Sequence, residues 1–488
     1  MTFDLLIRRA RIVDGLGGPA YLADVAISGD KIAAIGDLPE GCAVRQIDAE
    51  GRYLAPGFID VHTHDDTNVI RQPDMLPKLS QGVTTVIVGN CGISASPVSL
   101  PGNPPDPMNL LGSREDFRYP SFKAYAQALE AASPSINVAA LIGHTALRAN
   151  LMDRFDRPAS AEEIARMRKL LSDALAEGAI GLSTGLAYIN ARHAPAEEID
   201  ALAAAVGAAG GIYATHLRNE FEGLPEAMHE AFDTARRADV PLVISHLKCA
   251  GAGNWGNAPG AIARLERFAA EHPCNCDCYP YSASSSTLDP GQVTADFEIF
   301  ITWSAPHPEM AQRTLEAIAA QWGLTLLEAA HRLMPAGAVY HNMSEADMNL
   351  ILAHPLTMVG SDGLPNDPHP HPRLWGTFPR VIAHYCRDRK LFELPEAIRK
   401  MTSLPAVRFG LEGRGRVETG AFADLVLFDL EMLEDLADFA RPVAAARGID
   451  WVIVNGRIAY HQGRVGSRAG RLLKRAPASA PAEEVAHF

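Results

Sequence analysis

Between residues 57 and 363 the chain alternates short apolar runs with longer amphipathic stretches. Segments such as 160–178 and 223–238 repeat their apolar residues at helical spacing, whereas the short runs have the length of buried strands. The eight strand-like runs are GFIDVHTH (57–64), VTTVIVGNCG (83–92), INVAALIGH (136–144), AIGLSTGLAY (179–188), GIYATHLRNE (211–220), PLVISHLK (241–248), CNCDCYPYS (274–282) and TMVGSDG (357–363). Eight strand–helix units in series predict a TIM-like (β/α)8 barrel over residues 57–411. A doubly wound sheet is the alternative, but no Gly-rich phosphate loop supports it.

The two ends of the chain have another pattern, in which short strand-like runs are separated by Gly and Asp turns. Since the two ends flank the barrel, we predict one small β-sandwich domain built from residues 1–56 and 412–475. The long interval 283–356 precedes the last barrel strand and contains helical stretches, which predicts an inserted lid over the barrel mouth. The Ala/Pro-rich residues 476–488 predict a mobile tail.

Composition narrows the class of protein. Of 488 residues, 47% are hydrophobic and 21% charged, and the net charge of −14 argues against nucleic-acid and anionic membrane partners. No apolar run reaches the ~18 residues of a membrane-spanning helix. The first residues, MTFDLLIRRARIVDG, carry charges inside their apolar run and do not resemble a secretory signal. Seven scattered cysteines do not indicate a disulfide scaffold, so we expect a cytoplasmic enzyme.

Polar side chains recur where the predicted strands end, which is where barrel enzymes place their active sites. His62 and His64 are two residues apart, so both imidazoles lie on one face of a strand. Burying many such groups without partners would cost several kcal/mol, whereas Zn²⁺ accepts imidazole nitrogen and thiolate sulfur. We therefore predict a metal site at the barrel mouth, near these further strand-end residues: Cys91, His216, His246, Lys248 and Asp362.

The seventh predicted strand carries a possible false signal. Cys274, Cys276 and Cys278 share one face of that strand and could pass for metal ligands. If Tyr281 faces the barrel interior, however, the odd-numbered positions face inward and these cysteines face the helices. We expect them to be small buried thiols that pack in the core.

Several motifs carry a family resemblance. PGFIDVHTH (56–64), the histidines of the fifth and sixth strands and GSDG (360–363) look like the amidohydrolase superfamily. The resemblance covers essentially the whole chain, and it implies zinc-dependent hydrolysis of a small-molecule N-acyl-D-amino acid to a carboxylate and a free D-amino acid. The motifs that resemble the N-acyl-D-amino-acid deacylases, or D-aminoacylases, and especially their N-acyl-D-glutamate deacylase branch, are GNCG (89–92), STGLAY (183–188), HLRNE (216–220), SHLKC (245–249) and GSDGLPNDPHPHPRLWG (360–376).

The resemblance also implies a set of metal ligands. One tightly bound Zn²⁺ would lie on Cys91, His216 and His246, and His62 with His64 would mark a second, weaker site. Many amidohydrolases bridge two metals with a carboxylated lysine from the fourth strand. Here the fourth run, 179–188, has no lysine, and Cys91 takes that place, which disfavours hydantoinase-type enzymes.

Asp362 is the predicted catalytic residue: it would take a proton from water and deliver it to the leaving amine, which leaves poorly without one. A turn-forming aspartate before Gly363 is the alternative. The resemblance assigns Arg373 to the substrate α-carboxylate, which a guanidinium can bind through two hydrogen bonds; a surface loop arginine is the alternative. The same resemblance assigns three residues to the substrate pocket, namely Tyr188, Tyr281 and Ser285.

Lys248 carries the prediction of specificity. It lies two residues past His246, so it should point into the barrel mouth, where it could bind a second carboxylate and favour acidic side chains such as D-glutamate. Pairing of Lys248 with Glu220 is the alternative. A deacylase of broad or hydrophobic specificity, a dipeptidase and a cyclic amidohydrolase are the competing enzymes, and the sequence leaves the oligomeric state open.

Two further classes fit the sequence less well. A deaminase is disfavoured because Glu220 follows His216 by four residues and misses the strand-end position expected for its acid. A structural zinc protein would close its site with four protein ligands, whereas a catalytic site keeps one position open.

Overall fold

A closed parallel barrel forms the centre of the molecule in the computed structural model, which describes residues 2–100 and 102–474. The tail predicted over 476–488 lies outside the described residues. Each of the eight predicted apolar runs contains one barrel strand, so the barrel prediction is confirmed. In chain order the strands are β6 (Phe58–Asp60), β7 (Val83–Val88), β10 (Asn137–Gly143), β11 (Gly181–Gly185), β12 (Ile212–His216), β13 (Leu242–Ile244), β14 (Cys274–Cys278) and β19 (Thr357–Val359).

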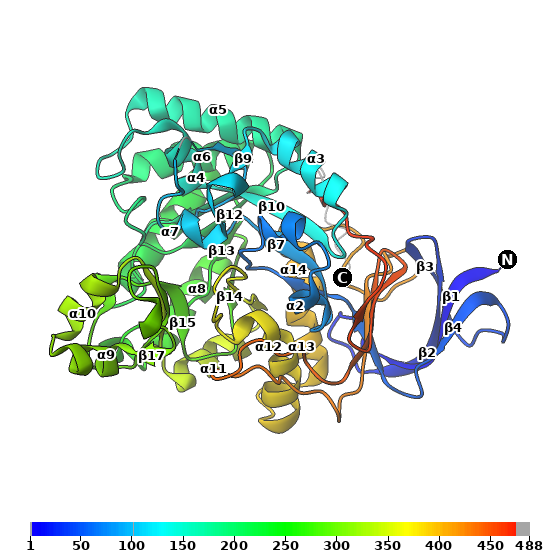
Figure 1. Cartoon of the computed structure of the whole chain (residues 1–488). Coiled ribbons are helices and arrows are strands. Elements are labelled where there is room, and N and C mark those ends of the chain that lie inside the picture. The colour runs from blue at the N-terminus through cyan, green and yellow to red at the C-terminus, as the bar shows by residue number, and fades with distance from the viewer. Residues whose placement is uncertain (1, 101, 475–488) are drawn as a thin grey trace.

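Helices surround the barrel on its outer face (Figure 1). The longest, α5, starts at a capping box in which Ser160 and Glu163 bind each other's backbone N–H, and it ends before Gly178 at φ 120°. Among the described residues, no helix is long and apolar enough to cross a membrane. The helices around the barrel are α1 (Asn68–Arg71), α2 (Leu76–Leu79), α3 (Phe122–Ala132), α4 (His144–Leu151), α5 (Ala161–Glu177), α6 (Ala196–Ala208), α7 (Leu224–Ala238), α8 (Ala258–Ala269), α11 (Glu345–Ala353), α12 (Arg373–Arg380), the π-helical segment Val381–Asp388, α13 (Leu394–Met401) and α14 (Ser403–Phe409).

The barrel strands separate two apolar cores. Ile59, Val61 and Ile87 belong to the inner core, which fills the closed sheet. Cys274, Cys276 and Cys278 belong to the outer core between strands and helices, where burial raises the pKa of Cys276 to about 12. The prediction that these cysteines pack in the core is confirmed.

Both ends of the chain form the small β domain. Hydrogen bonds link its nine strands into one sheet, so the predicted sandwich is a single sheet around a core of its own. The two ends join where β5 pairs antiparallel with β20. The strands are β1 (Phe3–Ile12), β2 (Tyr21–Ser28), β3 (Lys31–Gly36), β4 (Ala43–Asp48), β5 (Tyr53–Pro56), β20 (Leu425–Phe428), β21 (Ile449–Val454), β22 (Arg457–His461) and β23 (Arg464–Val465).

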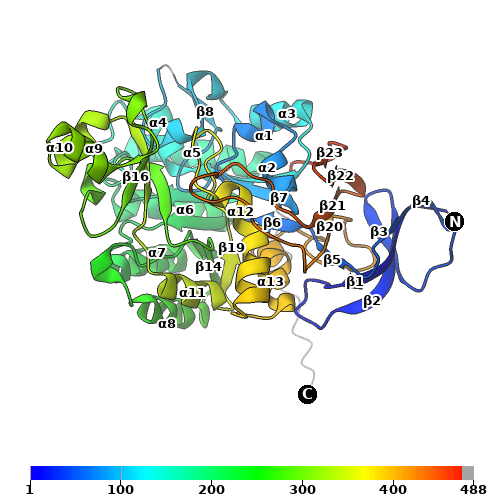
Figure 2. The ribbon, with the colours of Figure 1, turned by 60° about the horizontal axis from the view of Figure 1, so that its bottom comes forward.

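The segment between β14 and β19 contains a second small sheet with a core of its own. Its strands are β15 (Ser284–Thr287), β16 (Ile299–Ser304), β17 (Arg313–Thr314) and β18 (Ala336–Tyr340), and α9 (Leu315–Trp322) and α10 (Leu326–Leu333) pack on it. The later helix α11 packs on α8 and β14 instead, as part of the barrel's helical shell. This sheet and the small β domain lie at opposite ends of the molecule (Figure 2). The short strands β8 (Val98–Ser99) and β9 (Arg118–Tyr119) pair with each other.

The barrel closes between its first and last strands. Thr63 forms a parallel bridge with Gly363, and the Asp362 backbone N–H donates to the His62 carbonyl at 2.7 Å. Lys78 stabilises this junction, because its Nζ donates to Asp60 Oδ2 at 2.8 Å and to Ser361 Oγ at 2.9 Å. The ammonium also lies 3.2 Å from an Asp65 oxygen, and all three charged side chains are almost fully buried.

Replacing Lys78 by Met should lower the free energy of unfolding by about 3–5 kcal/mol, because two buried carboxylates lose their shared cation. Urea denaturation followed by circular dichroism measures the loss. Lys123→Met, at an exposed position on α3, is the control and should change stability by less than about 0.5 kcal/mol. Equal stability of the two variants would contradict the role of Lys78 in closing the barrel.

Candidate metal centre and substrate cavity

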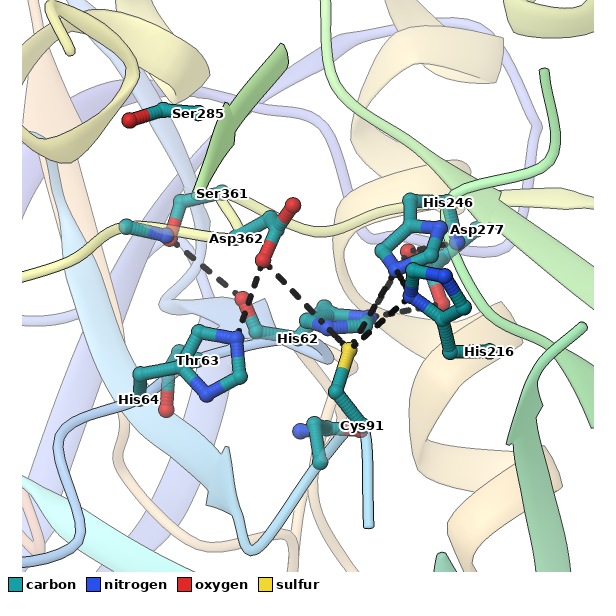
Figure 3. A network of polar contacts seen from close by, with 12 residues as sticks. His62, Thr63, His64, Cys91, His216, His246, Asp277, Ser285, Ser361 and Asp362 are labelled. Atoms are coloured by element: carbon teal, nitrogen blue, oxygen red, sulfur yellow. Dashed lines mark hydrogen bonds and ion pairs between the residues drawn. The ribbon is translucent and has the colours of Figure 1, made fainter. Parts of the chain in front are cut away.

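Three predicted ligands meet at the carboxyl ends of three barrel strands (Figure 3). Cys91 follows β7, His216 ends β12 and His246 follows β13. Cys91 Sγ lies 3.3 Å from His246 Nε2 and 3.8 Å from His216 Nδ1, and the two ring nitrogens lie 3.0 Å apart. The three side chains, separated by up to 155 residues along the chain, therefore point at one place.

The spacing and chemistry of these three atoms fit a zinc ion. A tetrahedron with Zn–N bonds of about 2.1 Å has edges of about 3.4 Å, close to the separations found here. Burial opposes a charged thiolate, but the neighbouring His62 and His246 charges outweigh it and hold the pKa of Cys91 well below its ordinary value. A thiolate with two imidazoles suits zinc, and three protein ligands leave one coordination position open, as in catalytic sites.

A second group of possible ligands shares Cys91 with the first and adds His62, His64 and Asp362. His62 Nε2 lies 3.1 Å from Cys91 Sγ, and His64 Nε2 lies 3.0 Å from Asp362 Oδ1. Burial opposes protonation of His64, but Asp362 and Cys91 raise its pKa to about 9. The structure thus places the HxH pair next to the first set, as its predicted role in a second metal site requires.

The backbone at this site is strained. Cys91, His246 and Asp362 have φ values of 52°, 34° and 50°, in the left-handed region that non-glycine residues rarely adopt. Each such residue costs of order 1–3 kcal/mol and persists only where surrounding structure holds it. Gly185 helps, because a Cβ atom there would lie only 2.2 Å from the Cys91 carbonyl oxygen.

Asp362 lies between two of the predicted metal ligands, His62 and His64, and Arg373. Its Oδ1 lies 3.0 Å from His64 Nε2 and 3.5 Å from His62 Nε2, and its Oδ2 lies 2.9 Å from Arg373 Nη1. Burial opposes the charge, but Arg373 and His62 outweigh it and hold the pKa of Asp362 well below its ordinary value. Arg373 is itself fully buried, so it is not a surface loop arginine.

A cavity of about 400 Å³ opens from the metal ligands toward the β15–β18 sheet. The predicted residues Tyr188, Lys248 and Ser285 line it, and the Tyr188 ring centre lies 4.7 Å from that of His216. Apolar residues supply much of the remaining wall, among them Leu110, Ile189, Phe221, Leu288 and Leu364. The cavity therefore has room for a small molecule next to the metal ligands.

The structure places Tyr279, rather than the predicted Tyr281, in the cavity wall. Tyr281 packs behind it against His371 and Arg380, with ring-to-ring and cation–ring distances of 5.0 and 4.9 Å. Tyr281 was assigned by the family resemblance, and strand alternation does not extend to it, because alternation holds only while the chain is extended and β14 ends at Cys278. Tyr279, the first odd-numbered residue after the strand, keeps the inward orientation.

Lys248 is already paired. Its Nζ lies 2.6 Å from Glu220 Oε1 and 2.7 Å from His246 Nδ1, so the alternative partner considered from sequence is present. The contact of Glu220 with the histidines and the position of Asp277 were not predicted from the sequence. Asp277 Oδ1 lies 3.3 Å from His62 Nδ1 and accepts from the His246 backbone N–H at 2.9 Å. Asp277 could have been predicted, because odd-numbered residues of β14 face the barrel interior.

Comparisons with known proteins agree with this geometry. Residues 45–460 match the model of the amidohydrolase family. The chain is 46% identical to a D-aminoacylase of Alcaligenes xylosoxydans xylosoxydans, over 98% of each chain. It is also 46% identical to an N-acyl-D-glutamate deacylase of that organism, over 99% of this chain and 98% of the relative.

A solved structure gives the same result. An N-acyl-D-glutamate deacylase from Bordetella bronchiseptica, complexed with zinc and a phosphonate inhibitor, is 42% identical and matches 97% of this chain and all of its own with a TM-score of 0.94. The chain belongs to the amidohydrolase family. It is a metal-dependent hydrolase that acts on amide bonds, and it resembles the D-aminoacylases in sequence and structure.

Replacing Cys91 by Ala should weaken zinc binding, because the site loses its only thiolate and keeps two imidazoles. We expect purified wild-type protein to retain zinc through dialysis and the variant to lose it, measured by elemental analysis. Cys249→Ala is the matched control, since Cys249 is a buried thiol of the outer core. Full zinc retention by the Cys91 variant would contradict the assignment.

Proposed function

We propose that this protein hydrolyses N-acyl-D-amino acids to a carboxylate and a free D-amino acid, with one zinc ion held tightly by Cys91, His216 and His246. The observation that carries the proposal is the meeting of these three ligands beside Asp362 at the floor of a cavity. The relatives named D-aminoacylase and N-acyl-D-glutamate deacylase support the substrate class. His62 and His64 are proposed to contribute to a second, weaker site.

Asp362 is the proposed proton carrier. A zinc ion at this site supplies Lewis-acid chemistry, which polarises an amide carbonyl and favours deprotonation of water. The Asp362 carboxylate accepts the proton from the attacking water and then donates it to the amide nitrogen as the C–N bond breaks. Support for this role comes from the position of Asp362, which lies within 3.5 Å of His62 and His64 and lines the same cavity as His216 and His246.

Arg373 is proposed to bind the substrate α-carboxylate. Its guanidinium lies 4.6 Å from the Tyr279 ring centre and donates through Nη2 to the Ser285 carbonyl at 3.1 Å. The Ser285 hydroxyl is buried and has no partner among the described residues, so it is available to a ligand. An anion bound at Ser285 in the cavity wall would have the Arg373 guanidinium, which is fully buried behind that wall, as its nearby cation.

Lys248 is proposed to extend the substrate range to acidic side chains such as D-glutamate. Its ammonium lines the cavity beside His246, although Glu220 shares its charge. Equal identity to a D-aminoacylase and to an N-acyl-D-glutamate deacylase leaves a neutral side chain as the competing preference. A second carboxylate that reaches Lys248 would gain a charge-assisted hydrogen bond, which a neutral side chain cannot form.

Asp362→Asn should retain zinc and lose about 10²- to 10⁴-fold in kcat, because the amide side chain keeps its shape but cannot carry the proton. Elemental analysis and steady-state hydrolysis of N-acetyl-D-methionine measure the two quantities on one sample. Unchanged kcat with zinc bound would remove Asp362 from proton transfer.

A panel of N-acetyl-D- and N-acetyl-L-amino acids tests the substrate class and the role of Lys248 together. We expect hydrolysis of D substrates only. Lys248→Met should lower kcat/KM for N-acetyl-D-glutamate about 10- to 100-fold more than for N-acetyl-D-methionine, since only the former loses an ionic contact. Equal losses on both substrates would exclude the role in side-chain recognition and leave the deacylase activity itself intact.

A further inference from the structure

Glu220 is a cavity-lining carboxylate on the far side of the metal histidines from Cys91. Its side chain is only 12% exposed. One oxygen, Oε1, lies 3.0 Å from His246 Nδ1, and the other, Oε2, lies 3.7 Å from His216 Nε2. The opposite ring nitrogens, His246 Nε2 and His216 Nδ1, are the ones that face Cys91. One carboxylate therefore faces the outer nitrogen of both imidazoles.

This arrangement matters because a neutral imidazole has one protonated nitrogen and one lone pair. Metal binding through Nε2 of His246 requires the proton to be on Nδ1. A carboxylate next to Nδ1 accepts that proton's hydrogen bond, which fixes the tautomer and the ring orientation and makes the ligand more basic. Removing such an outer partner typically costs 10- to 100-fold in metal affinity.

Lys248 can favour the other tautomer of His246, the one that cannot bind a metal through Nε2. Its Nζ lies 2.7 Å from His246 Nδ1, and an ammonium can only donate hydrogen bonds. Donation to Nδ1 would place the ring proton on Nε2, facing Cys91, and so remove the lone pair a metal needs. Glu220 Oε1, 2.6 Å from the same Nζ, binds the ammonium and competes for its protons.

We propose that Glu220 is the positioning residue of the metal centre: it holds His246 and His216 with their ligand nitrogens toward Cys91 and keeps Lys248 from donating to His246. This role concerns the metal centre and does not depend on which amide the enzyme hydrolyses. The same proposal implies that Lys248 weakens metal binding when Glu220 is absent.

The test measures the zinc dissociation constant of metal-free protein by competition with a chromogenic chelator. Glu220→Gln should bind zinc about 10- to 100-fold more weakly than wild type. The double variant Glu220→Gln with Lys248→Met should recover part of the loss, because the competing donor is gone and the Gln oxygen can still accept from Nδ1. A purely structural role of Glu220 would give no such recovery.

Glu230→Gln is the matched control, because Glu230, on α7, binds Arg218 in the loop after β12 and has no contact with a proposed metal ligand among the described residues. Its zinc affinity should equal that of wild type. Thermal unfolding of each metal-free protein shows whether it folds. If Glu220→Gln does not fold, Glu220→Asp replaces it, since aspartate keeps the charge and has a shorter reach. Glu220→Asp should also bind zinc more weakly than wild type. Wild-type affinity in the folded variant, or a double variant no tighter than Glu220→Gln, overturns the proposal. Absence of deacylase activity in zinc-loaded wild-type protein, with the zinc affinities of the variants as expected, would contradict the proposed function alone.

Discussion

The approach of one cysteine sulfur to two imidazoles at the rim of a closed sheet is the constraint on which the rest of this structure depends. Cys91, His216 and His246 come from three strands, and parallel strands deliver their carboxyl ends to the same edge. Two of these residues, Cys91 and His246, adopt left-handed backbone conformations to do so. The energy this costs is supplied by the large apolar cores on both sides of the barrel sheet.

Barrel closure brings Asp362, the proposed proton carrier, to the proposed metal ligands. Asp362 is 298 residues from His64 along the chain, and it reaches that side chain only because the last strand pairs with the first. The buried Lys78 binds a carboxylate of the first strand and the serine next to Asp362, so one ammonium couples the stability of the junction to the geometry of the site. Fold and chemistry are therefore difficult to perturb separately here.

Ion pairing within the site explains why a count of charges is a poor guide to its specificity. The two cations expected to receive substrate carboxylates already lie against acids, Arg373 against Asp362 and Lys248 against Glu220. A substrate carboxylate must therefore share or displace an existing partner. This exchange lowers the binding free energy gained from any single ionic contact, because the displaced carboxylate stays buried without its cation.

The sequence alone determined the barrel, its eight strands and the strand-end candidates for metal ligands. These features depend on local patterns: apolar runs of strand length, helical spacing between them, and polar residues at strand ends. The same alternation correctly turned the cysteines of β14 away from the interior. The family resemblance misplaced Tyr281: β14 ends at Cys278, and Tyr279 lines the cavity instead.

Tertiary structure alone decided which side chains form hydrogen bonds and ion pairs with one another. The contacts of Glu220 with His246 and of Asp277 with His62 join segments 26 and 215 residues apart, and no local pattern encodes distances between strands. The single sheet of the small β domain is a similar case, because pairing of β5 with β20 depends on where the barrel places the two ends. Local sequence patterns determine the helices and strands, whereas the packing of the whole chain determines which distant residues and strands come into contact.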